Sequence, residues 1–247
     1  DVLLWAKGLA LGKGLNVEVS EPDVWPLAVQ GPKAEELVAR VFGEDVRSLR
    51  YFEFGEYDFL GRRLVVARSG YSKQGGFEIY LDHSALGSQL WDTLWDAGQD
   101  LNVSPGCPNL IERIEGGLLS YGNEMTRENN PLEINLDRFC HLAGEIDYIG
   151  RSALEAIAKE GPARRMRGLL IEGSPCPPCG KPWPVMSHEG QIGQVTSAIW
   201  SPYFKKNVAL SFVEKDNWGE KTPVTVHLPD GKPAKAEVIK LPFLKER

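Results

Sequence analysis

The sequence has no long apolar run, few cysteines and no block of positive charge. Its 247 residues include four Cys and carry a formal net charge of −6. A helix that spans a bilayer needs about 18 or more consecutive apolar residues, and none occurs, so we expect no membrane partner. Nucleic acids bind concentrated cationic surfaces, so we expect no nucleic-acid partner either. A small ligand, including an anionic one, remains open.

The cysteines are too few and too scattered for a disulfide framework in a chain of this length. We therefore expect reduced thiols, and the lack of a signal-peptide pattern at the N-terminus favours a cytoplasmic protein. Only Cys176 and Cys179 form a close pair, in "SPCPPCG". A structural zinc site would need two further Cys or His ligands at comparable spacing, so a Pro-rich surface loop is the favoured interpretation. No role is assigned to the pair.

Hydrophobic residues make up 42% of the chain, and 17 Pro and 26 Gly separate short apolar runs. This pattern indicates an α+β protein. Strands and helices alternate as far as residue 162, and strand-length runs with Gly and Pro breaks follow, which predicts a small β-barrel. We expect two parts, residues 1–162 and residues 163–247.

The expected elements follow from apolar periodicity and from turn residues. Strands are expected at 16–21, 24–32, 51–61, 62–71 and 77–81, and in the barrel at 164–173, 184–200, 207–215, 222–231 and 235–243. Helices are expected at 1–15, 33–43, 84–99, 104–122 and 146–162. The first helix starts directly at Asp1, a plausible N-cap, with no initiator Met. We therefore expect that a preceding segment has been lost from the chain.

The run "SGYSKQGGFEIYL" places a carboxylate on a strand. Side chains two apart share a strand face, so Phe77 and Ile79 should face the core while Glu78 and Tyr80 face the other way. A carboxylate beside an aromatic ring suits a flat heterocycle with paired N–H donors. The competing interpretation is a solvated strand face on which Glu78 has no special role.

Arg113 lies at the edge of the apolar stripe of the helix expected at 104–122. It could reach across a groove to a carboxylate in bidentate geometry, or it could form an intramolecular ion pair. Gly116 and Gly117 weaken this helix, which indicates a close approach of a ligand or of another element. No motif for a hydrolytic triad or a phosphate-binding loop is found.

Several ordered motifs together resemble the glycine-cleavage T-protein (aminomethyltransferase) family over essentially the whole chain. They are "AVQGPKAEELV", "RSGYSKQGGFEIYL", "PNLIERIEGGLLSYGNEM", "YIGRSALEA" and "GQVTSAIWSPYFKKNVALSFV". Within the family, "SGYSKQGGFEIY" and "GCPNLIERIEGGLLSYGN" are most similar to the bacterial dimethylsulfoniopropionate demethylases. The pair of cysteines in "CPPC" is not part of the family pattern.

The resemblance implies a fold of three lobes around a folate channel, with a β-barrel as the last lobe. It implies tetrahydrofolate as the cofactor, with Glu78 holding the pterin ring and Arg113 near the folate. Tyr71 and Tyr80 match ring positions of the pocket, and Phe52 is a further candidate for packing on the ligand. The catalytic residue is unknown, because the functional Asp of the family falls in the expected preceding segment.

The demethylase-like motifs imply transfer of a methyl group from a sulfonium to N5 of tetrahydrofolate. The alternatives are an aminomethyltransferase, which would need a lipoyl carrier protein as partner, and a non-catalytic folate-binding accessory protein. The accessory relatives carry a Lys-Gly-Cys-x-x-Gly-Gln-Glu signature that "DYIGRSALEA" replaces here. A folate lobe detached from a larger flavin-linked oxidase also stays open, as does a homodimer.

Overall fold

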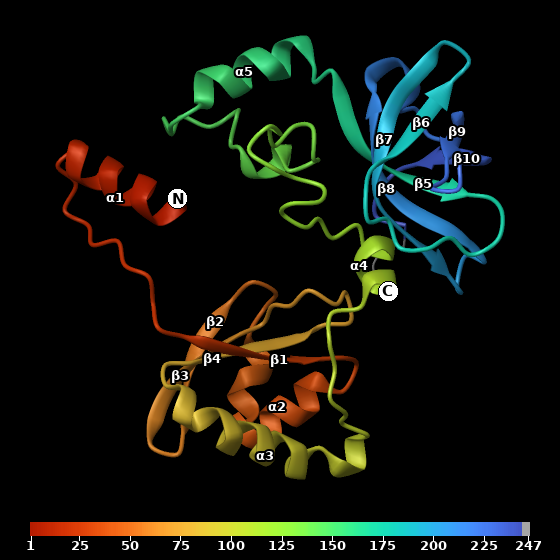
Figure 1. The fold of residues 1–247 in the computed structure, drawn as a ribbon. Coiled ribbons are helices and arrows are strands. Elements are labelled where there is room, and N and C mark those ends of the chain that lie inside the picture. The colour runs from red at the N-terminus through yellow and green to blue at the C-terminus, as the bar shows by residue number, and fades with distance from the viewer. Residues whose placement is uncertain (244–247) are drawn as a thin grey trace. The chain divides into compact units, whose positions relative to one another are not determined.

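The computed structural model describes residues 1–243 and separates into two compact units, which are treated one at a time. The first unit holds Asp1–Gly70 and Gln74–Gly106, and the second holds Tyr71–Lys73 and the chain from Cys107 onward (Figure 1). The expected α+β class with a C-terminal β-barrel is confirmed.

The first unit is built on a four-stranded antiparallel sheet in the order β1-β4-β3-β2. Its helices and strands are α1 (Val2–Gly12), β1 (Trp25–Gln30), α2 (Ala34–Phe42), β2 (Phe54–Phe59), β3 (Arg62–Ala67), β4 (Gly76–Leu81) and α3 (Gly87–Ala97), with short 3-10 turns at Glu44–Ser48, Ser84–Leu86 and Gln99–Leu101. Helices α2 and α3 lie against one face of the sheet (Figure 1).

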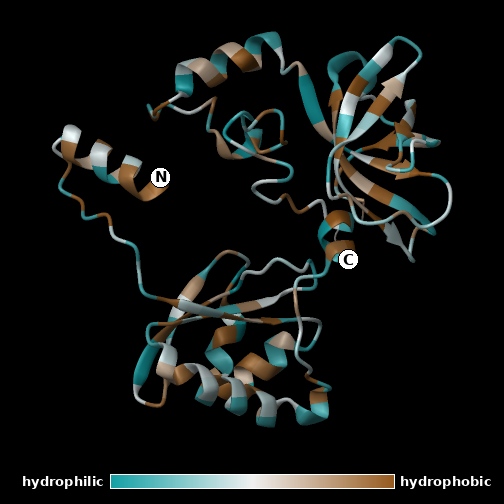
Figure 2. Ribbon diagram, in the orientation of Figure 1, coloured by the Kyte–Doolittle hydropathy of each residue, from teal (hydrophilic) through white to brown (hydrophobic). Residues whose placement is uncertain are grey.

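Alternation along the strands sorts the side chains of this sheet between its two faces. Phe77 and Ile79 of β4 are fully buried with Leu64 and Val66 of β3, as the period of two predicts. Helix α2 packs its apolar side chains against this face of the sheet. In Figure 2 the hydrophobic residues of the helix are brown. Glu78 therefore points to the opposite face of the sheet.

The second unit is built on a closed six-stranded barrel in the order β10-β5-β8-β7-β6-β9. Its elements are α4 (Leu110–Glu115), α5 (Arg151–Glu160), β5 (Arg164–Ile171), β6 (Trp183–Ser187), β7 (Gly190–Ser201), β8 (Lys206–Glu214), β9 (Pro223–His227) and β10 (Pro233–Ile239), with 3-10 turns at Asp137–Phe139 and Lys215–Asn217.

Strand β8 is buried on both faces and so joins two cores. Ala209 and Val213 point into the barrel, whereas Leu210 and Phe212 pack outside it against Ile114 of α4. A strand that is covered on both faces reads as a continuous apolar run. This explains why "NVALSFV" shows no alternation in the sequence.

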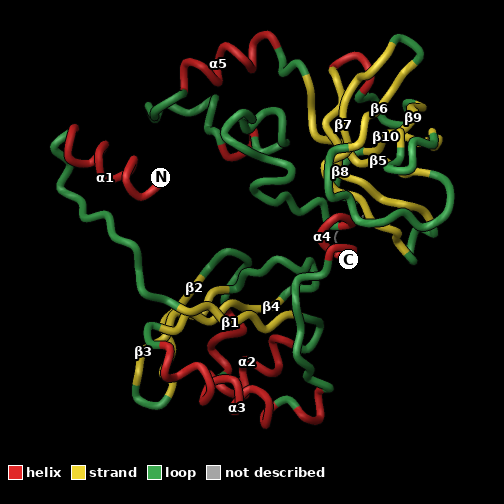
Figure 3. Tube along the Cα trace, viewed as in Figure 1, coloured by secondary structure: helices red, strands yellow, loops and turns green. Residues whose placement is uncertain are grey.

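Three expected elements are wrong. The single strand expected at 184–200 is a pair of antiparallel strands, β6 and β7, so the barrel has six strands and not five. The strand expected at 16–21 does not form, and Val17 is exposed there. The helix expected at 104–122 is reduced to α4, and the chain between α4 and α5 is mostly loop in Figure 3. Asn109 caps the start of α4 by accepting a bond from the Ile111 N–H at 2.9 Å, and Gly117 ends it with φ +64°.

Gly193 of β7 offers a test of barrel packing. A Cβ at this position would lie 2.1 Å from the carbonyl oxygen of Phe212 on β8. We expect Gly193→Ala to lower the free energy of unfolding by about 1–3 kcal/mol, because the strands must move apart. Urea unfolding measures the change. Gly180→Ala is the control, since nothing lies within 4 Å of a Cβ there, and equal stabilities of the two variants would contradict the prediction.

Candidate functional site

In the first unit, Glu78 lies in a row of side chains that crosses the sheet on the face opposite α2 and α3. The strand register pairs Glu78 with Ala28 of β1 and with Ala67 of β3, and Ala67 in turn pairs with Phe54 of β2. Neighbouring strands are about 4.8 Å apart. Ala67 therefore forms a low floor between the Glu78 carboxylate and the Phe54 ring, which suits a flat ligand, and Ala28 lies on the other side of Glu78.

The carboxylate of Glu78 is half-buried and is held by two hydroxyl groups. Ser69 Oγ donates to Glu78 Oε2 at 2.5 Å, and the Tyr80 hydroxyl reaches the same oxygen at 3.4 Å. Burial and the negative charge of Glu78 raise the pKa of Tyr80, so this phenol stays protonated at neutral pH and can donate. No residue of the same unit donates to Oε1 in the described chain. That oxygen can accept a bond from a ligand.

Phe52 lies near this row but does not belong to it. Its backbone N–H donates to the Arg68 carbonyl at 2.9 Å, its φ is +67°, and its ring lies 4.2 Å from the Tyr51 ring. The side chain is 71% exposed. The aromatic residue of the row itself is Phe54, which the sequence analysis missed. The alternation of "FEFGEYDF" could have found it, because the two-residue period also places Tyr57 and Phe59 on the core face.

In the second unit, Arg113 of α4 forms the intramolecular ion pair that was the competing interpretation. Its Nη1 lies 2.7 Å from Glu124 Oε2, and its side chain is only 9% exposed. Nη1 also donates to the Leu118 carbonyl at 3.1 Å, and Nη2 donates to Ser197 Oγ of β7 at 2.6 Å. A role of Arg113 toward folate stays a prediction.

Glu124 is the hub of this buried network, and the sequence analysis missed it. Its side chain is fully buried. It accepts a bond from the Ser120 N–H at 2.8 Å, one from Thr196 Oγ1 at 3.2 Å and a short one from Ser197 Oγ. The network fixes α4 and the loop after it against β7. The only sequence signal was a Glu in the motif "SYGNEM", which has no periodic context.

Tyr71 belongs to the second unit together with Arg113. Its hydroxyl donates to the Leu119 carbonyl at 2.5 Å. Burial raises the pKa of Tyr71, and the nearby positive charge of Arg113 opposes this rise. The predicted residues thus form two groups. Glu78, Tyr80 and Phe52 lie in the first unit, and Tyr71 and Arg113 lie in the second.

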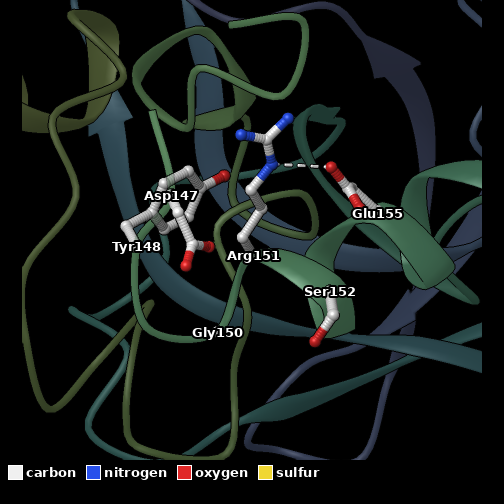
Figure 4. A pocket seen from close by; sticks show the side chains of 6 residues that line it. All are labelled: Asp147, Tyr148, Gly150, Arg151, Ser152 and Glu155. Atoms are coloured by element: carbon white, nitrogen blue, oxygen red, sulfur yellow. Dashed lines mark hydrogen bonds and ion pairs between the residues drawn. The ribbon is translucent and has the colours of Figure 1, made fainter. Parts of the chain in front are cut away.

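A separate hollow of about 390 Å³ lies at the start of α5 and contains none of the predicted residues. Figure 4 shows its lining, which is Asp147, Tyr148, Gly150, Arg151, Ser152 and Glu155. The Arg151 guanidinium already makes hydrogen bonds within the chain. It donates to Glu155 and to the carbonyls of Ile146 and Gly144, each at 2.7 Å. We therefore assign this hollow no ligand.

The cysteine pair lies in a loop that packs on the barrel core. Asn207 Oδ1 accepts from the Cys176 N–H at 2.9 Å, and both thiols are free. No group of three potential metal ligands occurs in residues 1–243. Burial raises the pKa of Cys179 to about 11, so its thiol is a poor nucleophile at neutral pH.

Alkylation can test whether the Cys179 thiol reacts more slowly than the exposed Cys107 thiol. A pKa of about 11 for Cys179 leaves roughly one thiolate in a thousand at pH 8. We expect iodoacetamide to modify the exposed Cys107 first, with Cys179 at least about 10-fold slower and accelerating as the pH rises toward 11. Peptide mass spectrometry over time gives both rates from one sample. Equal rates at pH 8 would contradict the expectation.

Two protein families match the chain. The family described as "GCVT N-terminal domain" matches residues 2–144, and the family described as "Glycine cleavage T-protein C-terminal barrel domain" matches residues 164–245. The structure is similar to glycine cleavage system aminomethyltransferase T from Bartonella henselae, with a TM-score of 0.79 and 26% identity, covering 98% of this chain and 66% of that one.

Curated relatives are similar at the sequence level. The dimethylsulfoniopropionate demethylase DmdA of Ruegeria pomeroyi is 54% identical, with 94% of this chain and 63% of the relative covered. The aminomethyltransferase of Koribacter versatilis is 32% identical, with 98% and 64% covered. The chain thus spans less than two thirds of the length of either relative. None of the helices in the described chain has the length and apolarity needed to cross a membrane.

Proposed function

Because this chain belongs to the glycine cleavage T-protein family, we propose that it acts in a tetrahydrofolate-dependent methyltransferase. The methyl donor is a sulfonium such as dimethylsulfoniopropionate, and the acceptor is N5 of tetrahydrofolate. The observation that carries this proposal is the half-buried carboxylate of Glu78, which two hydroxyls hold through Oε2 while Oε1 accepts no bond from the described residues of its unit. The 54% identity to a relative named as a demethylase supports the choice of donor.

The residues of the first unit fit the edge of a pterin. A pterin presents neighbouring N–H donors in one plane, and a carboxylate accepts such a pair. Glu78 would take the donors, Tyr80 and Ser69 would hold the carboxylate in place, and Ala67 would leave room for the ring. Phe52 and Tyr71 are proposed as further ring contacts, and Arg113 as a residue near the folate.

The chemistry needs little from the protein beyond position. Tetrahydrofolate supplies a nucleophilic nitrogen when bound, and a sulfonium is already an activated leaving group. The side chains of this chain would therefore orient the two reactants and exclude water. No protein nucleophile is required, and we assign no catalytic residue in this chain. We also propose a cytoplasmic location and a domain boundary near residue 162, just before β5 begins at Arg164.

A second candidate is the aminomethyltransferase activity. It is supported by several relatives with that name at 30–32% identity, among them the enzyme of Bacillus subtilis at 32%. The carrier of the aminomethyl group would then be a lipoyl protein. The lower identity makes it the alternative rather than the main proposal.

One pair of assays separates the two candidates. Two proteins are incubated with tetrahydrofolate and dimethylsulfoniopropionate: the 247-residue chain alone, and a longer chain extended to the full length of its relatives. We expect 5-methyltetrahydrofolate, detected by mass spectrometry, with a thioether as coproduct. No methylated product with the longer chain, together with turnover of an aminomethylated lipoyl carrier, would assign the aminomethyltransferase instead. Folate binding with failure of both assays would indicate the non-catalytic accessory protein.

A further inference from the structure

Two arginines of β5 point toward the interior at one end of the barrel. Residues two apart on a strand share a face, so both arginines lie on the same side of β5 as Leu169 and Ile171. These two aliphatic side chains belong to the barrel core. Trp218 packs against the same core. The guanidinium carbons of Arg165 and Arg167 lie 5.3 Å and 5.5 Å from the centre of its ring.

Arg165 has no acidic partner within the described part of its unit. Its Nε is buried and has no hydrogen-bond acceptor among residues 1–243. The Arg165 guanidinium lies against the Trp218 ring instead. Burying an N–H donor of a charged group without an acceptor lowers the stability of the folded protein. Such a donor therefore calls for an explanation.

Arg167 is paired only with neutral groups. Its Nε donates to the Trp218 carbonyl at 3.0 Å, and its Nη1 donates to the Met166 carbonyl at 3.0 Å and lies 3.4 Å from Asn135 Oδ1. Burial lowers the pKa of Arg167, and the positive charge of Arg165 lowers it further. Two like charges therefore lie together with no negative charge bonded to either in the described chain.

Ser211 adds a third polar group at this end of the barrel. It pairs directly with Arg167 in the register of β5 and β8 and is fully buried. Its neighbours two residues away, Ala209 and Val213, point into the barrel core, so Ser211 does too. Its Oγ also has no hydrogen-bond partner among residues 1–243. Both orphan polar atoms thus come from strands that are adjacent in the barrel.

We propose that Arg165, Arg167 and Ser211 form a binding site for a small oxyanion of the carboxylate or phosphate class. The planar guanidinium can donate two parallel bonds to two oxygens of either anion, and a hydroxyl can donate to the same ligand. An anion would offset the repulsion between the two arginines and satisfy both orphan atoms. The site is separate from the Glu78 row and does not depend on the proposed methyl transfer.

Isothermal titration of the full 247-residue chain tests the site. Sodium phosphate and sodium acetate are the probes, and sodium chloride keeps the ionic strength equal in every cell. We expect saturable binding of at least one probe to the wild type and at least about 10-fold weaker binding to Arg165→Gln, which loses a charge-assisted bond. Comparison of the two probes decides between a phosphate and a carboxylate ligand.

Arg138→Gln is the matched control. Arg138 is exposed and also stacks on an aromatic ring, with its guanidinium carbon 4.7 Å from the centre of the Phe139 ring, so it should bind like the wild type. Ser211→Ala serves if Arg165→Gln does not fold, and it should weaken binding about 2- to 10-fold. Absence of saturable binding to the wild type would overturn the proposal, as would wild-type affinity in whichever of these two variants folds.

Discussion

Glu124→Ala is expected to lower the free energy of unfolding by about 3–5 kcal/mol, because it leaves the charge of Arg113 buried without its partner. Glu124 is fully buried, and the Arg113 side chain is 9% exposed. The change also removes the acceptor of the Ser120 N–H and of two hydroxyls on β7. Such a loss is a large share of the stability of an ordinary domain.

Urea unfolding followed by circular dichroism measures this loss. Glu128→Ala is the control, because Glu128 is exposed in the same loop and should change the stability by less than about 0.5 kcal/mol. A double variant, Arg113→Met with Glu124→Leu, should recover much of the loss, since both charges are gone. A Glu124→Ala protein as stable as the control would show that the network contributes nothing.

Glu78→Gln is expected to weaken tetrahydrofolate binding about 10- to 100-fold, as a hydrogen bond to a charged group contributes about 1.5–3 kcal/mol. The substitution keeps the shape of the side chain but replaces one acceptor oxygen by an N–H₂ donor. That donor would face the N–H donors of the pterin. Calorimetry with tetrahydrofolate, on a chain extended to the full length of its relatives, gives the two affinities.

Glu56→Gln is the control for this measurement. Glu56 lies on the same face of the sheet but in the neighbouring row, where it pairs with Val65, so the affinity should not change. The unfolding curves of both variants should match the wild type, because neither position belongs to the core. Equal affinities of Glu78→Gln and the wild type would remove Glu78 from the binding role.

Local patterns were enough to predict β4 and the two faces of its sheet. The alternation of Phe77, Glu78 and Ile79 is a property of the strand itself, and burial of the two apolar residues confirms it. The barrel could be predicted as well, because Gly and Pro separate its strands in the sequence. Helix α2 ends one residue from its expected limits at either end.

Partners that come from distant parts of the chain could not be predicted. Arg113 meets Glu124 across a loop and meets Ser197 from a strand 84 residues away, and no spacing rule links these positions. The strand expected at 16–21 failed for a related reason. Its alternating Val17 and Val19 match the period of a strand, but a strand also needs a neighbour to bond with, and the sequence does not show which neighbours exist.

The row that joins Ala28, Glu78, Ala67 and Phe54 limits how this chain can evolve. A single residue inserted in β4 before Glu78 would move every later side chain of the strand to the opposite face of the sheet. Glu78 would then point into the core, and Ile79 would point away from it. Length changes are tolerated only where the turn before β4 absorbs them. We therefore expect natural variants to differ in the hairpin tip around Lys73 while keeping an unbroken count from Gly76 to Leu81.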